Sequence, residues 1–468
     1  MRLVFIVFLF LLVSFGTING QPKKIVCIGA SITEGVGTGD HSKNSFPAQL
    51  ETLLGNEYEV LNYGVSGRTL LRKGNLPYWK TDTYQEALKS NPDIVFIDLG
   101  GNDAKGINRP YYNEMEQDCR DIVNSFAGLP SKPRVILMLP LVSFEPDTNQ
   151  IWDPVIVNRI IPRLRQVAYE DNIEVLDMHP FFINKPEFYA DNVHPNKKGA
   201  TVIAERLYEQ VMLKTDAGFD IFKNLNIPYK VEMFGGFQCA SFVFEGRNAK
   251  IVKPREAAEG HPWVWRMRFW GHEPQADIAL LERGFHIIYC DASELIGNKE
   301  CISLWNKFYK MVHKAGLSKK GALEGMSRGG VYAFNWAIAN PDKISCVYVD
   351  NPLLNYNRFV KNIDENMTKD FMKAYNLKTK EELEKFKQGP IDKTKEIVKG
   401  KYPILILCGD ADEVVSPQEN TFLFEKKIKE ANGDITVIVK PGLKHHPHSL
   451  PDPTPIVDFI VKAANKSK

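Results

Sequence analysis

The chain has 468 residues, too many for one ordinary domain and enough for two. Hydrophobic residues make up 44% of it and charged residues 25%, which excludes a disordered chain. The formal net charge of +2 at pH 7 gives no electrostatic reason to expect a nucleic-acid partner.

Residues 1–20 are predicted to be a secretory signal peptide. Arg2 supplies the positive charge, residues 3–15 (LVFIVFLFLLVSF) form an apolar core, and the small, polar stretch GTING ends at Gly20. An uncleaved anchor is the alternative, but the apolar run is short for a membrane span and no later run is longer. We therefore expect a periplasmic or secreted protein with no stable membrane insertion after cleavage.

Residues 21–216 are predicted to form an α/β domain, because apolar strands alternate there with amphipathic helices. We expect strands at 24–29, 59–64, 93–100, 134–140 and 173–178, and helices at 46–55, 155–172 and 196–214. Continuously apolar strands separated by helices indicate a parallel sheet that is covered on both faces.

A second domain is predicted for residues 217–468. Residues 229–254 alternate apolar and polar side chains between glycines, which predicts antiparallel strands, and an α/β pattern follows to the end. No low-complexity linker separates the halves, so we expect them to pack closely. The seven cysteines form no CxxC pair and mostly lie in apolar strands, so neither a disulfide framework nor a zinc site is expected.

Four predicted loops of the first domain carry side chains suited to acyl transfer. Ser31 follows the first strand, Gly67 the second, Asn102 the third, and Asp191 and His194 the last. Each has an ordinary structural explanation, such as a helix cap or a turn. However, loops at the carboxyl ends of parallel strands meet at one edge of the sheet, where ligands bind. There these residues supply a nucleophile, oxyanion donors and a base.

The blocks GASITEG, NYGVSGRT, LGGND and DNVHPN resemble those of the SGNH (GDSL-type) hydrolases, in the family's order. The resemblance implies a flavodoxin-like three-layer sandwich with Ser31 as nucleophile and His194 as base, oriented by Asp191. It also implies that Asn102 and the N–H groups of Ser31 and Gly67 stabilise the oxyanion. The usual Gly-Asp-Ser reads Gly-Ala-Ser here, which leaves the nucleophile in place.

The second domain contains a G-x-S-x-G motif around Ser327, between a short strand and a helix. Acidic residues and then histidines end later strands, and this order resembles that of the α/β-hydrolase fold. The resemblance implies Ser327 as nucleophile, the Arg328 N–H as one oxyanion donor, and a second donor from the loop near Trp270.

Several residues compete for the other two positions of this second site. Asp412 is favoured as the acid by its spacing from the preceding glycine, with Asp410 and Asp350 as alternatives. His445 is favoured as the base because it comes first after the strand, with His446 and His448 as rivals. Three histidines within four residues also suit a metal, but no acidic or cysteine ligand is spaced to join them, so no metal is expected.

We therefore expect a secreted, cofactor-free serine esterase with two sites that forms acyl-enzymes on an acylated polysaccharide or oligosaccharide. The first domain is similar to domains that remove acetyl groups from carbohydrates. For the second domain, the candidate substrates are acetyl, hydroxycinnamoyl and methyl esters. The alternatives are a lipid esterase or thioesterase, one active domain beside a degenerate glycan-binding one, and a glycan-binding surface protein. The aromatic run at 261–274 predicts either a core strand or the lining of a site.

Overall fold

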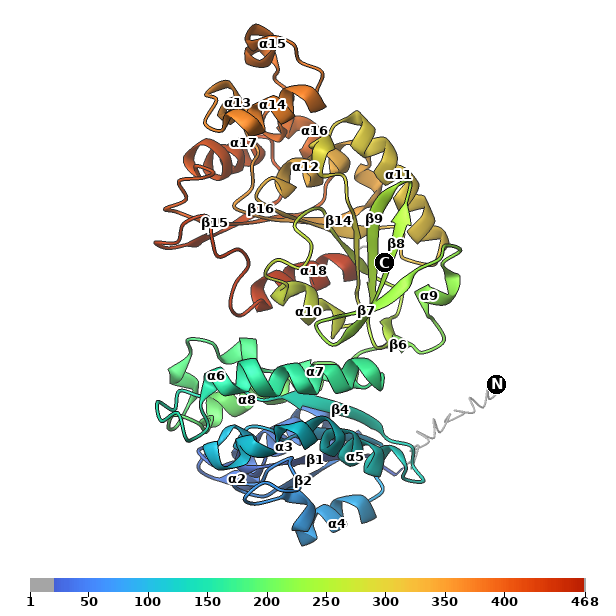
Figure 1. Ribbon diagram of the computed structural model, residues 1–468, viewed down its shortest axis with the longest axis vertical. Coiled ribbons are helices and arrows are strands. Elements are labelled where there is room, and N and C mark those ends of the chain that lie inside the picture. Colours follow the sequence, from blue (N-terminus) through green and yellow to red (C-terminus); the bar gives the residue numbers. More distant parts are fainter. Residues whose placement is uncertain (1–20, 467–468) are drawn as a thin grey trace, which may run out of the picture.

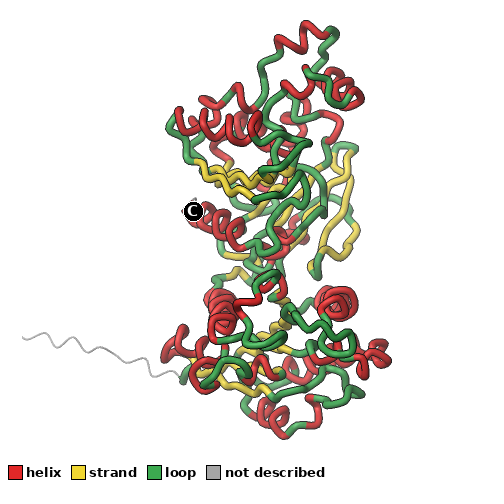
Figure 2. The backbone as a smooth tube through the Cα atoms, turned by 90° about the vertical axis from the view of Figure 1, so that its left-hand side faces the viewer, coloured by secondary structure: helices red, strands yellow, loops and turns green. Residues whose placement is uncertain are grey.

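The computed structural model describes residues 21–466, so the predicted signal peptide lies outside the described residues. Two bodies are stacked along the long axis of the molecule, with the N-terminal half at one end and the C-terminal half at the other (Figure 1). The view turned by 90° shows the same division (Figure 2). Within residues 21–466, no helix combines the length and the apolar character needed to cross a bilayer.

The first body is built on a five-stranded parallel sheet in the order β2-β1-β3-β4-β5. This is a doubly wound order whose switch point lies between β1 and β3, where such folds open a crevice for ligands. The strands are β1 (Lys23–Gly29), β2 (Tyr58–Gly64), β3 (Ile94–Asp98), β4 (Arg134–Leu139) and β5 (Glu174–Asp177).

Helices cover both faces of this sheet, as the sequence predicted. Ile25 and Cys27 of β1 pack with α3 and α8, while Val26 and Ile28 pack with α4, α5 and α7 on the other face. The helices are α1 (Ser31–Glu34), α2 (His41–Asn44), α3 (Phe46–Leu54), α4 (Asp82–Lys89), α5 (Met115–Ala127), α6 (Asp153–Val155), α7 (Ile161–Glu170) and α8 (Lys197–Met212). The result is the expected three-layer sandwich.

The second body is built on a nine-stranded sheet in the order β16-β15-β14-β13-β11-β12-β9-β8-β7. The predicted antiparallel strands form one edge, and the strands from β12 to β16 are parallel. The strands are β7 (Lys230–Phe234), β8 (Phe237–Phe244), β9 (Arg247–Lys253), β11 (Trp263–Arg266), β12 (His286–Cys290), β13 (Gly321–Met326), β14 (Ile344–Asp350), β15 (Ile404–Gly409) and β16 (Ile435–Lys440).

Helices also cover both faces of the second sheet. α10 and α18 lie on the side facing the first body, and α11, α12, α16 and α17 lie on the other (Figure 1). Trp263 and Trp265 are buried in the core, where Trp265 packs against Trp305 and Trp336. The helices are α9 (Ile221–Asn224), α10 (Gln275–Leu281), α11 (Lys299–Lys314), α12 (Gly329–Ala339), α13 (Asn357–Val360), α14 (Glu365–Ala374), α15 (Lys380–Lys385), α16 (Thr394–Lys399), α17 (Leu423–Glu430) and α18 (Thr454–Lys466).

The two bodies share a buried polar contact. Arg206 of α8 lies 3.2 Å from Glu282, which follows α10, and the backbone N–H of Asp177 donates to the same carboxylate at 2.8 Å. Both Arg206 and Glu282 are buried. At the predicted boundary, β6 (Thr215–Asp216) pairs with β10 (Ala257–Ala258). The halves are thus joined by side-chain and backbone contacts as well as by the chain itself.

Candidate active sites

The first candidate site begins where β1 ends and α1 turns back over it. A Cβ on Gly29 would lie 2.0 Å from Thr33 Oγ1 and 2.7 Å from the carbonyl oxygen of Asp98. Only glycine fits this close approach. The turn places Ser31 at the start of α1, beside the switch point of the sheet.

The structure brings three of the predicted residues together in one relay. Ser31 Oγ lies 2.9 Å from His194 Nε2, and His194 Nδ1 lies 2.8 Å from Asp191 Oδ2. The other oxygen of Asp191 accepts from the backbone N–H groups of Val193 and His194, both at 2.7 Å. Partial burial works to raise the pKa of Asp191, but these N–H groups and the His194 side chain lower it overall. Asp191 therefore stays ionised and orients the imidazole.

The predicted oxyanion donors come from the two loops next to Ser31. Asn102 lies just after β3 and lines the same pocket as Ser31. Gly67 lies in the loop after β2 with a φ of +76°, a conformation that glycine adopts without strain. Glu34, which the sequence analysis did not single out, fixes this loop: its carboxylate accepts from the backbone N–H of Ser66 at 2.7 Å and from the Ser66 hydroxyl.

The pocket at Ser31 is small and largely apolar. Its volume is about 30 Å³. Besides Ser31 and Asn102, it is lined by Ala30, Ile32, Asp98, Gly101, Pro140, Leu141, Val142, Ser143, Ile151, Ile156 and Val193. A volume of this size is close to that of one or two waters and suits a short acyl group.

Two buried carboxyl groups hold the segments that carry this site through hydrogen bonds. Asp98 accepts from the Thr33 hydroxyl at 2.8 Å, and burial raises the pKa of Asp98 to about 6. Asp103 accepts from the backbone N–H groups of Leu70 and Leu71, and burial likewise raises the pKa of Asp103 to about 6. Asp103 thus joins the loop after β3 to the loop after β2. The sequence placed Asp103 beside Asn102 but gave no sign of this role.

The second candidate site begins at a sharp turn between β13 and α12. Ser327 has a φ of +49°, which is strained for a non-glycine residue and is typical of a nucleophile elbow. Its backbone N–H donates to the carbonyl of Asp350 at 2.8 Å. A Cβ on Gly325 would lie 2.6 Å from the backbone of Gly329, so the turn needs small residues on both sides.

Here too the structure forms a Ser–His–Asp relay. Ser327 Oγ lies 3.0 Å from His445 Nε2, and His445 Nδ1 lies 2.7 Å from Asp412 Oδ2. Asp412 also accepts from the backbone N–H groups of Val414 and Val415, both at 2.8 Å. Burial works to raise the pKa of Asp412, but His445 and these N–H groups lower it overall. The favoured pair, Asp412 and His445, is the pair that faces Ser327.

The rival residues have other partners. Asp410 accepts from the backbone N–H of Gly442 at 2.7 Å. Asp350 accepts from Lys440 Nζ at 2.8 Å and lies 3.4 Å from His448 Nδ1. His446 stacks edge-on against His448, with ring centroids 4.8 Å apart. None of these four side chains bonds to Ser327 or His445 in residues 21–466.

Of the two residues predicted to supply oxyanion donors at this site, Arg328 lies next to Ser327 and Trp270 packs elsewhere. Arg328 directly follows Ser327, at the start of α12. The ring of Trp270, by contrast, packs against Phe234 of β7 and Tyr289 of β12. In the same loop after β11, the Cβ of Arg268 lies 3.8 Å from the position that a Cβ on Gly329 would take. The loop from which the second donor is predicted therefore passes close to the start of α12.

Two arginines near the Ser327 turn gather their guanidinium groups at the ring of Phe269, and the sequence analysis did not predict this pair. The Cζ atoms of Arg268 and Arg328 lie 4.9 and 5.9 Å from the ring centroid of Phe269. Neither forms an ion pair within the described part of the chain, and Arg268 Nε is buried without a partner. Burial and the like charge of Arg268 lower the pKa of Arg328.

Comparison with known families assigns a hydrolase family to each half of the chain. Residues 27–202 match the GDSL-like lipase/acylhydrolase family, and residues 305–466 match the prolyl oligopeptidase family. The chain thus joins a GDSL-like domain to an α/β-hydrolase domain, and both resemblances predicted from the sequence are confirmed.

Among curated proteins, the chain is 36% identical over 200 residues to an acetylxylan esterase of Xylanibacter ruminicola. The alignment covers 39% of this chain and 42% of that protein, so the chain spans about two fifths of the relative's length. Among solved structures, it is similar to an S-formylglutathione hydrolase from Agrobacterium tumefaciens (13% identity, 51% of this chain, 97% of that chain, TM-score 0.37). It is also similar to the solved structure of Porphyromonas gingivalis dipeptidyl peptidase 4 (16% identity, 50% of this chain, 35% of that chain, TM-score 0.38).

Proposed function

We propose that the protein is a carbohydrate esterase with two serine sites, and that the Ser31 site removes O-acetyl groups from a polysaccharide. The observation that carries this proposal is the relay of Ser31, His194 and Asp191, with Ser31 lining a pocket of about 30 Å³. The identity to an acetylxylan esterase supports the acetyl group and a xylan-type substrate. The apolar core of residues 1–20 supports export to the periplasm or medium.

The chemistry at Ser31 follows from the geometry of the relay. His194 Nε2 takes the proton from Ser31 Oγ as that oxygen attacks the acetyl carbonyl. The N–H groups of Ser31 and Gly67 and the Asn102 side chain stabilise the oxyanion, and His194 then returns the proton to the departing sugar hydroxyl. Water enters by the same route, with His194 again as the base, and releases acetate. None of these steps calls on a cofactor.

The size of the Ser31 pocket favours this reading over a lipid esterase or thioesterase. An acetyl group needs room for one methyl, whereas a fatty acyl chain needs a long apolar channel. The buried side chains of Leu141 and Ile156 are part of the lining of this small pocket. The rate should therefore fall steeply as the acyl group grows from acetyl to butyryl.

For the Ser327 site we propose hydrolysis of a second ester, on a glycan that carries negative charge. The unpaired guanidinium groups of Arg268 and Arg328 support this choice, because Arg binds the carboxylate of a uronic acid through paired hydrogen bonds. A peptide bond is the second candidate substrate, favoured by the match to the prolyl oligopeptidase family.

The test uses three proteins: wild type, Ser31→Ala and Ser327→Ala. We would measure acetate released from acetylated xylan and pectin, hydrolysis of acetyl, butyryl and feruloyl chromogenic esters, and cleavage of a panel of dipeptidyl anilides. We expect Ser31→Ala to abolish acetate release from xylan and to leave the other site active. Ser327→Ala should abolish a different ester activity, with acidic glycans preferred.

Other outcomes separate the alternatives. If Ser327→Ala abolishes only anilide cleavage, the second site is a peptidase. If it changes no activity, the second domain is a scaffold or glycan-binding module. If Ser31→Ala leaves acetate release from every glycan unchanged, the acetylesterase proposal is wrong.

A further inference from the structure

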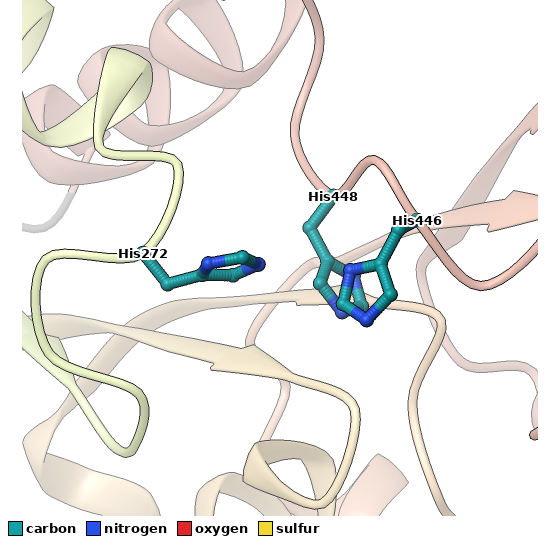
Figure 3. Close-up of side chains that lie close together, drawn as sticks. All are labelled: His272, His446 and His448. Atoms are coloured by element: carbon teal, nitrogen blue, oxygen red, sulfur yellow. The ribbon is translucent and has the colours of Figure 1, made fainter.

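Three histidines from two distant segments meet beside the Ser327 site. His272 follows β11, and His446 and His448 follow β16. Figure 3 shows the ring of His272 pointing across a gap between the two loops toward the other two rings. One ligand nitrogen of each residue lies within 4.8 Å of those of the other two. The ring centroids are 4.8 to 5.8 Å apart.

The Ser327 relay does not use these three imidazoles. Both ring nitrogens of His445 are taken by Ser327 and Asp412. The three other imidazoles lie edge to face with one another, outside the relay. Neutral imidazoles that converge in this way are the ligand set of a zinc-type cation, with a fourth position left open.

The carboxylate of Asp350 orients the ring of His448. His448 Nδ1 lies 3.4 Å from Asp350 Oδ1, which leaves Nε2 as the nitrogen free of this bond. Asp350 is fully buried and is itself held by Lys440 Nζ at 2.8 Å and by the backbone N–H of Ser449 at 2.6 Å. A carboxylate on the second nitrogen of a histidine is the usual outer shell of a metal-bound imidazole.

A second carboxylate, that of Glu273, lies beside His272. Glu273 Oε2 is buried and has no hydrogen-bond partner in residues 21–466, and it lies 3.8 Å from His272 Nε2. A buried carboxylate oxygen without a partner is costly, and a nearby cation would satisfy it. Glu273 is the acidic partner that spacing along the sequence did not provide, because it comes from the other loop.

The loop that carries His272 is held in place for this role. The backbone carbonyl oxygen of His272 accepts a hydrogen bond from the guanidinium of Arg266. Arg266 is buried and also pairs with Asp277 and Glu324. A ligand on a fixed backbone loses little freedom when an ion binds.

We propose that His272, His446 and His448 bind one divalent cation of the zinc type, and that the ion ties together the two loops bordering Ser327. Ligand nitrogens around tetrahedral zinc lie roughly 3.3 Å apart, since each bond is about 2.0–2.1 Å long. The three nitrogens lie within 4.8 Å of one another, so any pair must approach by at most about 1.5 Å when the ion binds. The serine chemistry proceeds without the ion, whose effect is to hold the segment that carries His445.

The test measures binding directly, on the full chain without a polyhistidine tag and after treatment with a chelator. Co²⁺ is added while its visible absorption is followed, and Zn²⁺ is titrated by calorimetry. The variants are His272→Ala and His446→Ala, both at exposed positions. The matched controls are His313→Ala, an exposed histidine of the same domain, and Ser327→Ala.

We expect one equivalent of each ion in the wild type and in both controls, with the absorption of tetrahedral Co²⁺. Each cluster variant should bind at least tenfold more weakly. Wild-type protein that binds neither ion, or variants that bind as tightly as wild type, would overturn the proposal.

Amide hydrogen exchange tests the tie between the loops. Zn²⁺ should slow exchange in residues 443–449 and 268–273 of the wild type by tenfold or more, and should leave His272→Ala unchanged. Binding without slower exchange would show that the ion does not join the loops, and the second half of the proposal would fall.

Discussion

His448 Nδ1 lies 3.4 Å from Asp350 Oδ1, so two residues that the sequence offered as members of the second relay are paired with each other instead. Their pairing leaves Asp412 and His445 to face Ser327. Lys440 Nζ donates to the same oxygen of Asp350 at 2.8 Å. The loop after β16 thus supplies His445 to the relay with Ser327 and Asp412, and supplies His448 to a separate polar network with Asp350 and Lys440.

The first prediction compares the two histidines of that loop. His445→Gln removes the base, and we expect the turnover number at the Ser327 site to fall by on the order of 10⁴-fold or more. His448→Gln should keep at least a tenth of the wild-type rate, because its ring does not contact Ser327. Steady-state kinetics on the substrate lost in Ser327→Ala checks both. The assignment of the base fails if His448→Gln is the more damaging change.

The second prediction concerns Glu34, which holds the loop before Gly67 through the N–H and hydroxyl of Ser66. Glu34→Gln weakens this anchor and lets the Gly67 N–H drift from the oxyanion. We expect kcat for acetyl esters to fall by about 10-fold with little change in KM, because the contact matters mainly in the transition state. Glu51→Gln, at an exposed position of α3, is the control and should match wild type. An equal rise in KM instead would point to a role in substrate binding.

The third prediction follows from the burial of Asp98, which raises its pKa from 3.8 to about 6. The folded state then binds this proton more tightly than the unfolded state. The contribution of Asp98 to stability is therefore full below pH 3.8 and is lost as the pH rises through about 6.

Asp98→Asn removes that pH dependence. Relative to wild type, the variant should gain stability between pH 4 and pH 7, by up to about 3 kcal/mol. Calorimetric unfolding of the full chain at a series of pH values measures this difference. The exposed Asp147→Asn variant should show no such trend, and a flat difference for Asp98→Asn would contradict the argument.

The fourth prediction concerns the contact between the two bodies. Burial raises the pKa of Glu282 to about 7, and Arg206 at 3.2 Å works to lower it. Glu282→Ala would remove the buried carboxylate that faces Arg206 and leave this guanidinium with its longer contacts to Gln210 at 3.3 Å and Glu209 at 3.5 Å, at a cost of about 3–5 kcal/mol. Glu209→Ala removes an exposed carboxylate that pairs with Arg283 at 2.8 Å and more distantly with Arg206, and it should cost less than about 1 kcal/mol.

Urea unfolding of both interface variants checks this difference. We expect the midpoint to drop clearly for Glu282→Ala and to change little for Glu209→Ala. Equal midpoints would show that the buried pair does not hold the bodies together.

The sequence by itself determined the strands and both candidate nucleophiles, because these features are local. Side chains alternate between the two faces of β1, so Ile25 and Cys27 pack on one face and Val26 and Ile28 on the other. Small residues before Ser31 and Ser327 mark a sharp turn after a strand. Strands that end in such turns must present them at one edge of a parallel sheet. The order of the four first-domain blocks then pointed to His194 and Asp191 as partners of Ser31.

The tertiary structure alone decided which side chains face one another across separate loops. Spacing could not show that Arg268 approaches Gly329 beside the Ser327 turn, or that Glu34 anchors the loop of Gly67. It also could not bring His272 to His446, since these residues are far apart in the chain. Such contacts depend on how strands β11 and β16 and their loops are placed in the sheet, and no local pattern encodes that placement.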